Sequence, residues 1–227
     1  MIKRLLVCSC IAATMGSVHA APSCANFATP PNSRVVIVSQ SMIVNGVPMS
    51  ASELHSKQTP SDVMRFYRGE WESRNQRVLE TSEGDWKTLA TKDGGCFFTV
   101  QIKPGIDSGT YALLGVTQLV TGTPKARGEG FPKMGGSTVY NDIVSQDMGK
   151  TGRTLLMGNK FSLDANASFY RNAMSSDGWV SISDRRGKTE GGARLIQIWR
   201  RGLAEANLVI GTSADQTSVV VNIVDRP

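Results

Sequence analysis

Cysteine and histidine are scarce in this chain, and their scarcity argues against several kinds of site. The 227 residues include four cysteines and two histidines. Two of these cysteines and one histidine lie within the first 20 residues, a segment that we expect to be removed. The remaining Cys24, Cys96 and His55 lack the number and spacing of ligands that a metal site requires. The sequence therefore predicts no metal centre and no cofactor.

The chain also lacks the signatures of several enzyme classes. No Gly-x-Ser-x-Gly elbow occurs, and the glycines near Gly128 are not followed by the Lys-Ser/Thr of a phosphate-binding loop. A Ser-His or Cys-His mechanism would have to use His55, for which the sequence offers no placed nucleophile. Ser56 and Lys57 are adjacent on an expected strand and so point to opposite faces. We therefore assign no catalytic residue and lean towards a protein that is not an enzyme.

The N-terminus has the pattern of a secretory signal peptide. A cationic start at residues 1–4 precedes an apolar stretch over residues 5–16 and small residues up to Ala20. That stretch is shorter than the about 20 residues needed to cross a bilayer, and no later segment is longer. We expect residues 1–20 to be a signal peptide, the mature protein to be soluble and periplasmic or secreted, and no transmembrane segment to be present.

Export places the two remaining cysteines in an oxidising compartment. Cys24 and Cys96 are then the only pair, and we predict a disulfide between them. On the chain-entropy account, closing a loop of this length is worth about 4 kcal/mol.

The positive charge of the chain is mild and scattered. Removing Lys3 and Arg4 with the signal lowers the formal net charge from +6 to +4. Residues 21–120 hold nine basic and nine acidic side chains, whereas residues 121–227 hold fourteen and ten. Nucleic-acid binding requires a denser basic stripe with interleaved aromatic residues. We expect no nucleic-acid partner.

A short pattern occurs twice in the chain. Residues 59–68 read TPSDVMRFYR and residues 162–171 read SLDANASFYR. Each begins with a hydroxyl residue suited to an N-cap, has an aspartate in the first turn and carries Phe-Tyr-Arg, which predicts a helix. A tryptophan beside a Gly-Asp or Asp-Gly pair and a strand opened by Gly-Gly follow each copy. Such a repeat predicts two related units.

Alternating apolar residues and turn signals predict the strands of both units. Asn45-Gly46 is a strong hairpin signal. We expect strands over 34–44, 49–56, 87–91, 96–102 and 110–119, and then over 138–144, 153–157, 179–183, 193–200, 207–212 and 217–224. The predicted fold class is α+β, with two tandem repeats, each a mainly antiparallel sheet covered by one helix. The repeats span 21–120 and 137–227 around a Gly/Pro-rich linker at 121–136, and one continuous sheet and two domains both remain open.

The repeated aromatic residues have two interpretations. As a recognition feature, they give these candidate binding residues: Tyr67, Arg68, Tyr170, Arg171, Arg200 and Arg201. Packing is the stronger interpretation, because apolar residues at helical spacing usually face a core. In that case the two phenylalanines face the sheet, the tyrosine hydroxyls are wet at its rim, and Trp86 and Trp179 close the core.

The succession of Ser/Thr with Phe-Tyr-Arg, then Gly/Asp-Trp, then a Gly-Gly strand resembles a group of uncharacterised exported proteins of Gram-negative bacteria. The resemblance covers both repeats. It implies export and a repeat architecture, and brings no activity or site residues with it.

The sequence therefore favours an exported, non-catalytic binding or assembly protein of the bacterial envelope, an accessory of a secretion or surface-structure system. Its expected partner is an envelope protein or a cell-wall component, and its oligomeric state is left open. The alternative is a small secreted hydrolase or inhibitor-like effector. A deep pocket that holds His55 beside a serine or carboxylate would favour this alternative.

Overall fold

The computed structural model describes residues 24–120, 122–147, 149–189, 192–213 and 215–225. The expected signal peptide, residues 1–20, lies outside this range. The elements of the first half are β1 (Ser33–Val44), β2 (Val47–Ser56), α1 (Pro60–Glu72), β3 (Leu79–Glu83), β4 (Trp86–Asp93), β5 (Cys96–Pro104), a 3₁₀ turn (Ile106–Ser108) and β6 (Thr110–Gln118). Those of the second are β7 (Thr138–Asp147), β8 (Lys150–Asn159), α2 (Leu163–Ser176), β9 (Val180–Thr189), β10 (Gly192–Arg201), β11 (Ala204–Thr212) and β12 (Thr217–Asp225).

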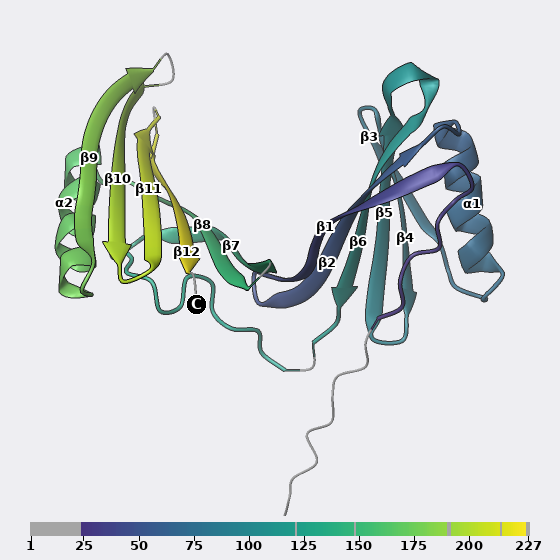
Figure 1. Cartoon of the computed structure of the whole chain (residues 1–227), viewed down its shortest axis with the longest axis horizontal. Coiled ribbons are helices and arrows are strands. Elements are labelled where there is room, and N and C mark those ends of the chain that lie inside the picture. Colours follow the sequence, from purple (N-terminus) through teal and green to yellow (C-terminus); the bar gives the residue numbers. More distant parts are fainter. Residues whose placement is uncertain (1–23, 121, 148, 190–191, 214, 226–227) are drawn as a thin grey trace, which may run out of the picture.

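The strands of the described residues form one continuous sheet of twelve strands. Its order is β3-β4-β5-β6-β2-β1-β7-β8-β12-β11-β10-β9, and every pair of neighbouring strands is antiparallel. The sheet bends into a U, with α1 and α2 on the outside of its two arms (Figure 1). The α+β class is confirmed, and the choice between one sheet and two is resolved in favour of one.

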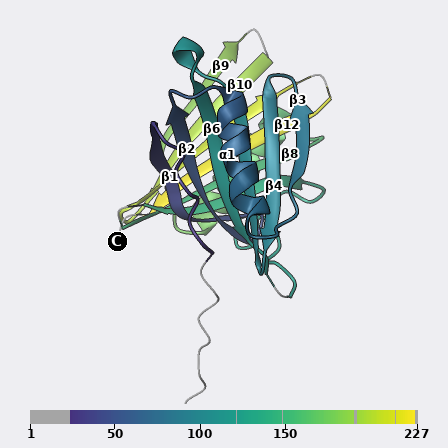
Figure 2. The ribbon, with the colours of Figure 1, turned by 90° about the vertical axis from the view of Figure 1, so that its right-hand side faces the viewer.

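Both halves have the same strand order. Counted from the middle of the sheet, the first arm runs β1-β2-β6-β5-β4-β3 and the second runs β7-β8-β12-β11-β10-β9. Each helix follows the second strand of its half and covers its own arm (Figure 1), and Figure 2 shows α1 lying across the strands of the first arm. The arms join where β1 pairs with β7, at Met42–Val44 and Ile143–Ser145.

Two of the repeated sequence motifs do not fall at matching places. Gly95 precedes β5, whereas Gly192 opens β10, the counterpart of β4 by strand order. Trp86 opens β4, whereas Trp179 precedes β9, the counterpart of β3. The expected correspondence of the Gly-Gly strands and of the tryptophans is therefore wrong, and only the helical part of the repeat matches by position.

The helix starts follow the sequence prediction. The hydroxyl of Thr59 accepts a hydrogen bond from the Asp62 backbone N–H at 3.3 Å, and Ser162 accepts one from Ala165 at 3.1 Å. Helix α1 ends at Glu72. The chain then forms β3, which is not among the strands expected from the sequence.

The tyrosines, not the phenylalanines, face the sheet. Tyr67 is 1% exposed and Tyr170 is 0% exposed, whereas Phe66 and Phe169 are half-buried. In α1 the reason is spacing, because Tyr67 lies four residues from both Val63 and Trp71 and so completes the buried stripe. The expected orientation of the aromatic pair is thus reversed.

The tryptophans also differ from expectation. Trp179 is buried in the core beneath α2, as expected. Trp86 is half-buried and alternates along β4 with Leu89, which lies in the core beneath α1, so Trp86 faces the side of the sheet away from the helix. Only Trp179 closes a core.

A segment of irregular chain, here called the lead segment, precedes the first strand of each half. In residues 24–32, Phe27 lies against Tyr67 with ring centroids 5.9 Å apart. In residues 122–137, Phe131 stacks on Tyr170 at 6.1 Å and is 7% exposed. The segment 121–136, expected to be a linker, therefore supplies part of the second core.

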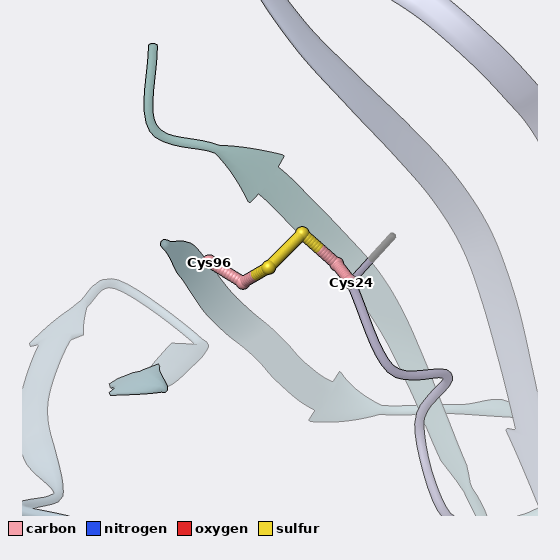
Figure 3. Close-up of a disulfide and its surroundings, with 2 residues drawn as sticks. All are labelled: Cys24 and Cys96. Carbon is pink, nitrogen blue, oxygen red and sulfur yellow. A yellow bond between two sulfur atoms is a disulfide. The ribbon is translucent and has the colours of Figure 1, made fainter. Parts of the chain in front are cut away.

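The first lead segment is held covalently. Cys24 and Cys96 form the predicted disulfide, which ties this segment to the start of β5 (Figure 3). The second lead segment is held by polar contacts instead, because Asp142 accepts a hydrogen bond from the Gly128 backbone N–H at 2.7 Å and Arg153 donates to the Glu129 carbonyl at 3.0 Å.

Candidate binding face

The face of the sheet opposite the helices lines the inside of the U (Figure 1). Alternation along each strand defines this face, because every second residue packs beneath α1 or α2 and its neighbours point the other way. Cross-strand pairing gathers two rows of side chains on it. The aromatic row on the first arm is His55, Tyr111, Lys103 and Trp86. The aliphatic row on the second arm is Leu156, Val220, Val209 and Ile196.

The aromatic row is a connected cluster. The ring centroid of Tyr111 lies 5.4 Å from that of His55 and 6.1 Å from that of Trp86. The Lys103 ammonium group lies 4.7 Å from the Trp86 centroid and 5.3 Å from that of Tyr111, within cation–π range. The cluster thus offers aromatic surface and a positive charge on one face of the sheet.

Glu53 joins two members of this row. Its carboxylate accepts a hydrogen bond from the Tyr111 hydroxyl at 2.9 Å, and its other oxygen lies 3.3 Å from Nε2 of His55. The bond to Glu53 raises the pKa of Tyr111, with smaller contributions from burial and from the negative charge of Glu53. The hydroxyl stays protonated at neutral pH, so Tyr111 acts as a hydrogen-bond donor and not as a nucleophile.

A hollow of about 760 Å³ opens beside the aromatic row. The loop between β5 and β6 forms one wall, and His55, Trp86 and Tyr111 form part of the rest. Ile106 in this loop is 89% exposed and lines the same hollow. The loop extends the apolar surface that the aromatic residues begin.

The aliphatic row crosses four adjacent strands of the second arm. Leu156 is 37% exposed and Ile196 is 45% exposed, with half-buried Val220 and Val209 between them. Each pair is directly opposite in the strand register, which brings the side chains into contact range. The row is a continuous apolar strip on an uncovered face.

The structure does not bring the sequence-predicted binding residues together. Tyr67 and Tyr170 are buried beneath different helices, and burial raises the pKa of both hydroxyls, to about 12 for Tyr170. Arg68 pairs with Glu80 of β3, and Arg171 with Asp184 of β9 at 2.7 Å.

The other two predicted residues lie at the end of β10. Arg200 is exposed on the inside of the U, opposite Glu205 of β11. Arg201 pairs with Asp177 at 2.7 Å, and its guanidinium group lies 4.6 Å from the Trp179 ring centroid. Arg68, Arg171 and Arg201 thus each make an ion pair within their own arm.

In the part of the chain that the structure describes, no nucleophile is aligned with His55. Glu53 is within hydrogen-bonding distance of His55, but the hollow around them is open to solvent. Ser56 faces the helix side of the sheet, where its hydroxyl accepts a hydrogen bond from the Gln58 backbone N–H at 3.0 Å. Among the described residues, no cluster of three or more His, Cys, Asp or Glu side chains could hold a metal ion.

Sequence reasoning missed Tyr111, Lys103 and Trp86 as members of one site. Strand alternation could have placed Tyr111 and Lys103 opposite the buried residues of their own strands. Their meeting depends on the pairing of β6 with β5 and of β5 with β4, which no local pattern specifies.

No family model, curated protein or solved structure matches the chain. Within the described part of the chain, neither helix has the length and apolar character needed to cross a membrane.

Proposed function

We propose that this protein is a non-catalytic binding protein of the bacterial envelope, periplasmic or secreted, and that the inside of the U is its contact surface. The observation that carries the proposal is the aromatic row, half-exposed on a face that no described helix covers. Aromatic residues flanked by a charged group are typical anchors of binding interfaces.

The composition of the face favours a protein partner over a cell-wall glycan. A glycan needs aromatic rings and polar groups, which the first arm offers. The aliphatic row of the second arm adds a dry strip with no hydrogen-bonding groups, which suits the apolar core of a protein interface. An envelope protein, as part of a secretion or surface-structure assembly, fits both rows.

Three observations support an exported location. The N-terminal sequence has the signal-peptide pattern, the resemblance is to exported proteins of Gram-negative bacteria, and Cys24 is joined to Cys96. Disulfides persist in the periplasm and outside the cell.

We also infer that the two arms derive from one duplicated unit of two strands, a helix and four strands. The equal strand order supports this, as do matched contacts. Thr110 and Thr217 each open the last strand of their half and donate to a backbone carbonyl before the helix, at 2.8 and 2.6 Å. Phe27 and Phe131 each cover a helix tyrosine. A duplicated unit gives the protein two related contact surfaces.

Capture from envelope extract tests the proposed function. Immobilised wild-type protein should retain one specific envelope protein, and Trp86→Ala should weaken that binding by at least about tenfold. Phe161→Ala is the control, because Phe161 is 45% exposed and lies outside both rows. Circular dichroism should confirm that both variants fold.

Three outcomes would contradict the proposal. One is the absence of any specific partner, and another is equal retention by the wild type and Trp86→Ala. The third is retention on isolated peptidoglycan sacculi with no protein partner, which would mean that the partner is a cell-wall component.

A hydrolase or inhibitor-like effector is the second candidate, and the His55–Glu53 contact is the observation that favours it. If His55 is a general base, His55→Gln should abolish any ester or peptide hydrolysis that the purified wild type performs. Equal rates for both proteins would remove this candidate.

A further inference from the structure

The described sheet has two outer edges, and both carry charge. β3 is a short strand of five residues with Glu80 and Glu83 exposed. β9 presents exposed Arg185, Arg186 and Lys188. Short edges and charged side chains are ways in which proteins prevent an edge strand from pairing with another chain.

A third edge lies in the middle of the sheet. It is long and, from Val35 onward, uncharged, and its strand shifts register against β2 between Ile37 and Ser39 and between Ser39 and Met42. β7 pairs with β1 only at Met42–Val44, and no described strand pairs with this side of β1 over residues 33–41. Val35, Val36, Ile37 and Val38 are 37%, 37%, 57% and 58% exposed. No charged residue occurs between Val35 and Val44.

Such a segment is suited to pair with another strand. Four consecutive β-branched residues favour the extended conformation, and alternation places Val35, Val36 and Ile37, which precede the first register shift, on both faces of the sheet. An edge strand also presents unpaired backbone N–H and C=O groups. The partner must therefore be an extended, uncharged strand with apolar residues on both faces.

β1 itself meets this description, and the chain already uses the same kind of pairing. At residues 42–44, β1 is covered by antiparallel pairing with β7, its counterpart by strand order in the other half. β7 ends at Asp147, and no described strand pairs with this edge of β1 before Met42. A second β1 would continue the existing ladder with an equivalent strand.

We propose that the free edge of β1 pairs with the same edge of a second copy, forming an antiparallel two-fold dimer with a continuous sheet. A two-fold axis at the centre of residues 33–41 places Ile37 opposite Ile37 of the second copy. Because the other two edges carry charge, assembly stops at two chains.

Light scattering coupled to size exclusion tests this dimer. Over concentrations from about 1 µM to about 1 mM, the range of weak to moderate association, the wild-type mass should rise from one chain to two and no further. Ile37→Lys should remain a single chain throughout, because two ammonium groups would meet at the axis.

Ile182→Lys is the matched control. Ile182 is 52% exposed on the outer edge strand β9, close to the 57% of Ile37. It should dimerise like the wild type. Equal melting temperatures of the two variants would show that neither effect arises from unfolding.

Three results would overturn the proposal. They are a wild type that stays a single chain at every concentration, an Ile37→Lys variant that still dimerises, and equal loss of the dimer in both variants. The first would leave the edge to a strand of another protein, and the others would place the interface elsewhere.

Discussion

At the scale of single residues, the ring and the hydroxyl of each buried helix tyrosine have opposite effects on stability. The side-chain oxygens of Tyr67 and Tyr170 have no hydrogen-bond partner among the described residues. An unpaired buried hydroxyl costs about 1–3 kcal/mol. Each ring nevertheless fills the space between its helix, the sheet and the phenylalanine of the lead segment in the same half. The rings stabilise the cores, and their hydroxyls do not.

Removing these hydroxyls should therefore not destabilise the protein. We expect Tyr67→Phe and Tyr170→Phe to keep the free energy of unfolding or raise it by about 1 kcal/mol, measured by urea denaturation. Tyr111→Phe is the control, because its hydroxyl donates to Glu53 and its loss should destabilise slightly. A loss above about 1 kcal/mol in either core variant would mean that its hydroxyl is bonded.

The sequence could predict that the Phe-Tyr-Arg residues pack, but not which ring is buried. Helical periodicity allows a buried stripe to include either neighbour. The choice depends on Val63 and Trp71, which fix the stripe of α1 on Tyr67. The same limit applies to Arg68 and Arg171. Glu80, the partner of Arg68, lies on β3, which the sequence did not predict, and Asp184, the partner of Arg171, lies one residue beyond the strand expected over 179–183.

Asp142 makes stability depend on pH. Burial acts to raise the pKa of this carboxyl, but hydrogen bonds from Arg153 and from the Gly128 backbone N–H outweigh it and lower the pKa. A pKa lower in the folded than in the unfolded state stabilises the fold above the unfolded value of about 3.9. That contribution is lost as the pH falls through the folded pKa.

Asp142→Asn measures this contribution. At neutral pH the free energy of unfolding of the variant should be about 3 kcal/mol lower than that of the wild type, because Arg153 loses its charged partner. The difference should begin to shrink as the pH falls below about 4, where the unfolded wild-type chain takes up the proton, and should shrink further as the pH falls through the lowered pKa of the folded state. Urea titrations at a series of pH values would reveal it, and a difference independent of pH would contradict the assignment.

At the scale of elements, the two lead segments are held in different ways. The Cys24–Cys96 bond fixes the first lead segment to the sheet, and hydrogen bonds fix the second. Replacing both cysteines by serine should lower the free energy of unfolding by about 4 kcal/mol, the entropy of the loop that the bond closes.

Reduction provides the control for this prediction. A reducing agent should bring the wild type to the stability of the double serine variant and leave that variant unchanged. A loss below about 1 kcal/mol would mean that the unfolded chain gains little freedom when the bond is absent.

Most elements could be predicted because their signals are local. The turn at Asn45-Gly46 is an example, since both residues have positive φ, 53° and 84°. A β-carbon on Gly46 would also lie 2.8 Å from Cβ of Pro124, so only glycine fits there. β3 escaped prediction because all five of its residues are exposed and no alternation marks it.

At the scale of the whole molecule, the inside of the U could not be predicted. Its rows form only when strands distant in sequence pair in one register, as Leu156 does with Val220. The prediction of a linker at 121–136 fell short for a related reason. The glycines of this segment indicate a linker, yet Phe131 within it is a core residue of the second half.

The two halves share a sheet but not a core. The cluster beneath α1 and the cluster beneath α2 have no residue in common. Between them lie the three residue pairs of β1 with β7 and the hydrogen bonds of Asn45 with Asn141 and Asp142. A narrow joint between separate cores couples their unfolding weakly.

Calorimetry should therefore record two unfolding transitions, one for each half. Leu54 and Leu155 are both 0% exposed and lie in different clusters, so each reports on one core. Leu54→Ala should lower one transition and Leu155→Ala the other, each by a loss of about 2–5 kcal/mol in its own half. If both variants shift one common transition equally, the joint transmits the full stability of each arm to the other, and the molecule unfolds as a single cooperative unit.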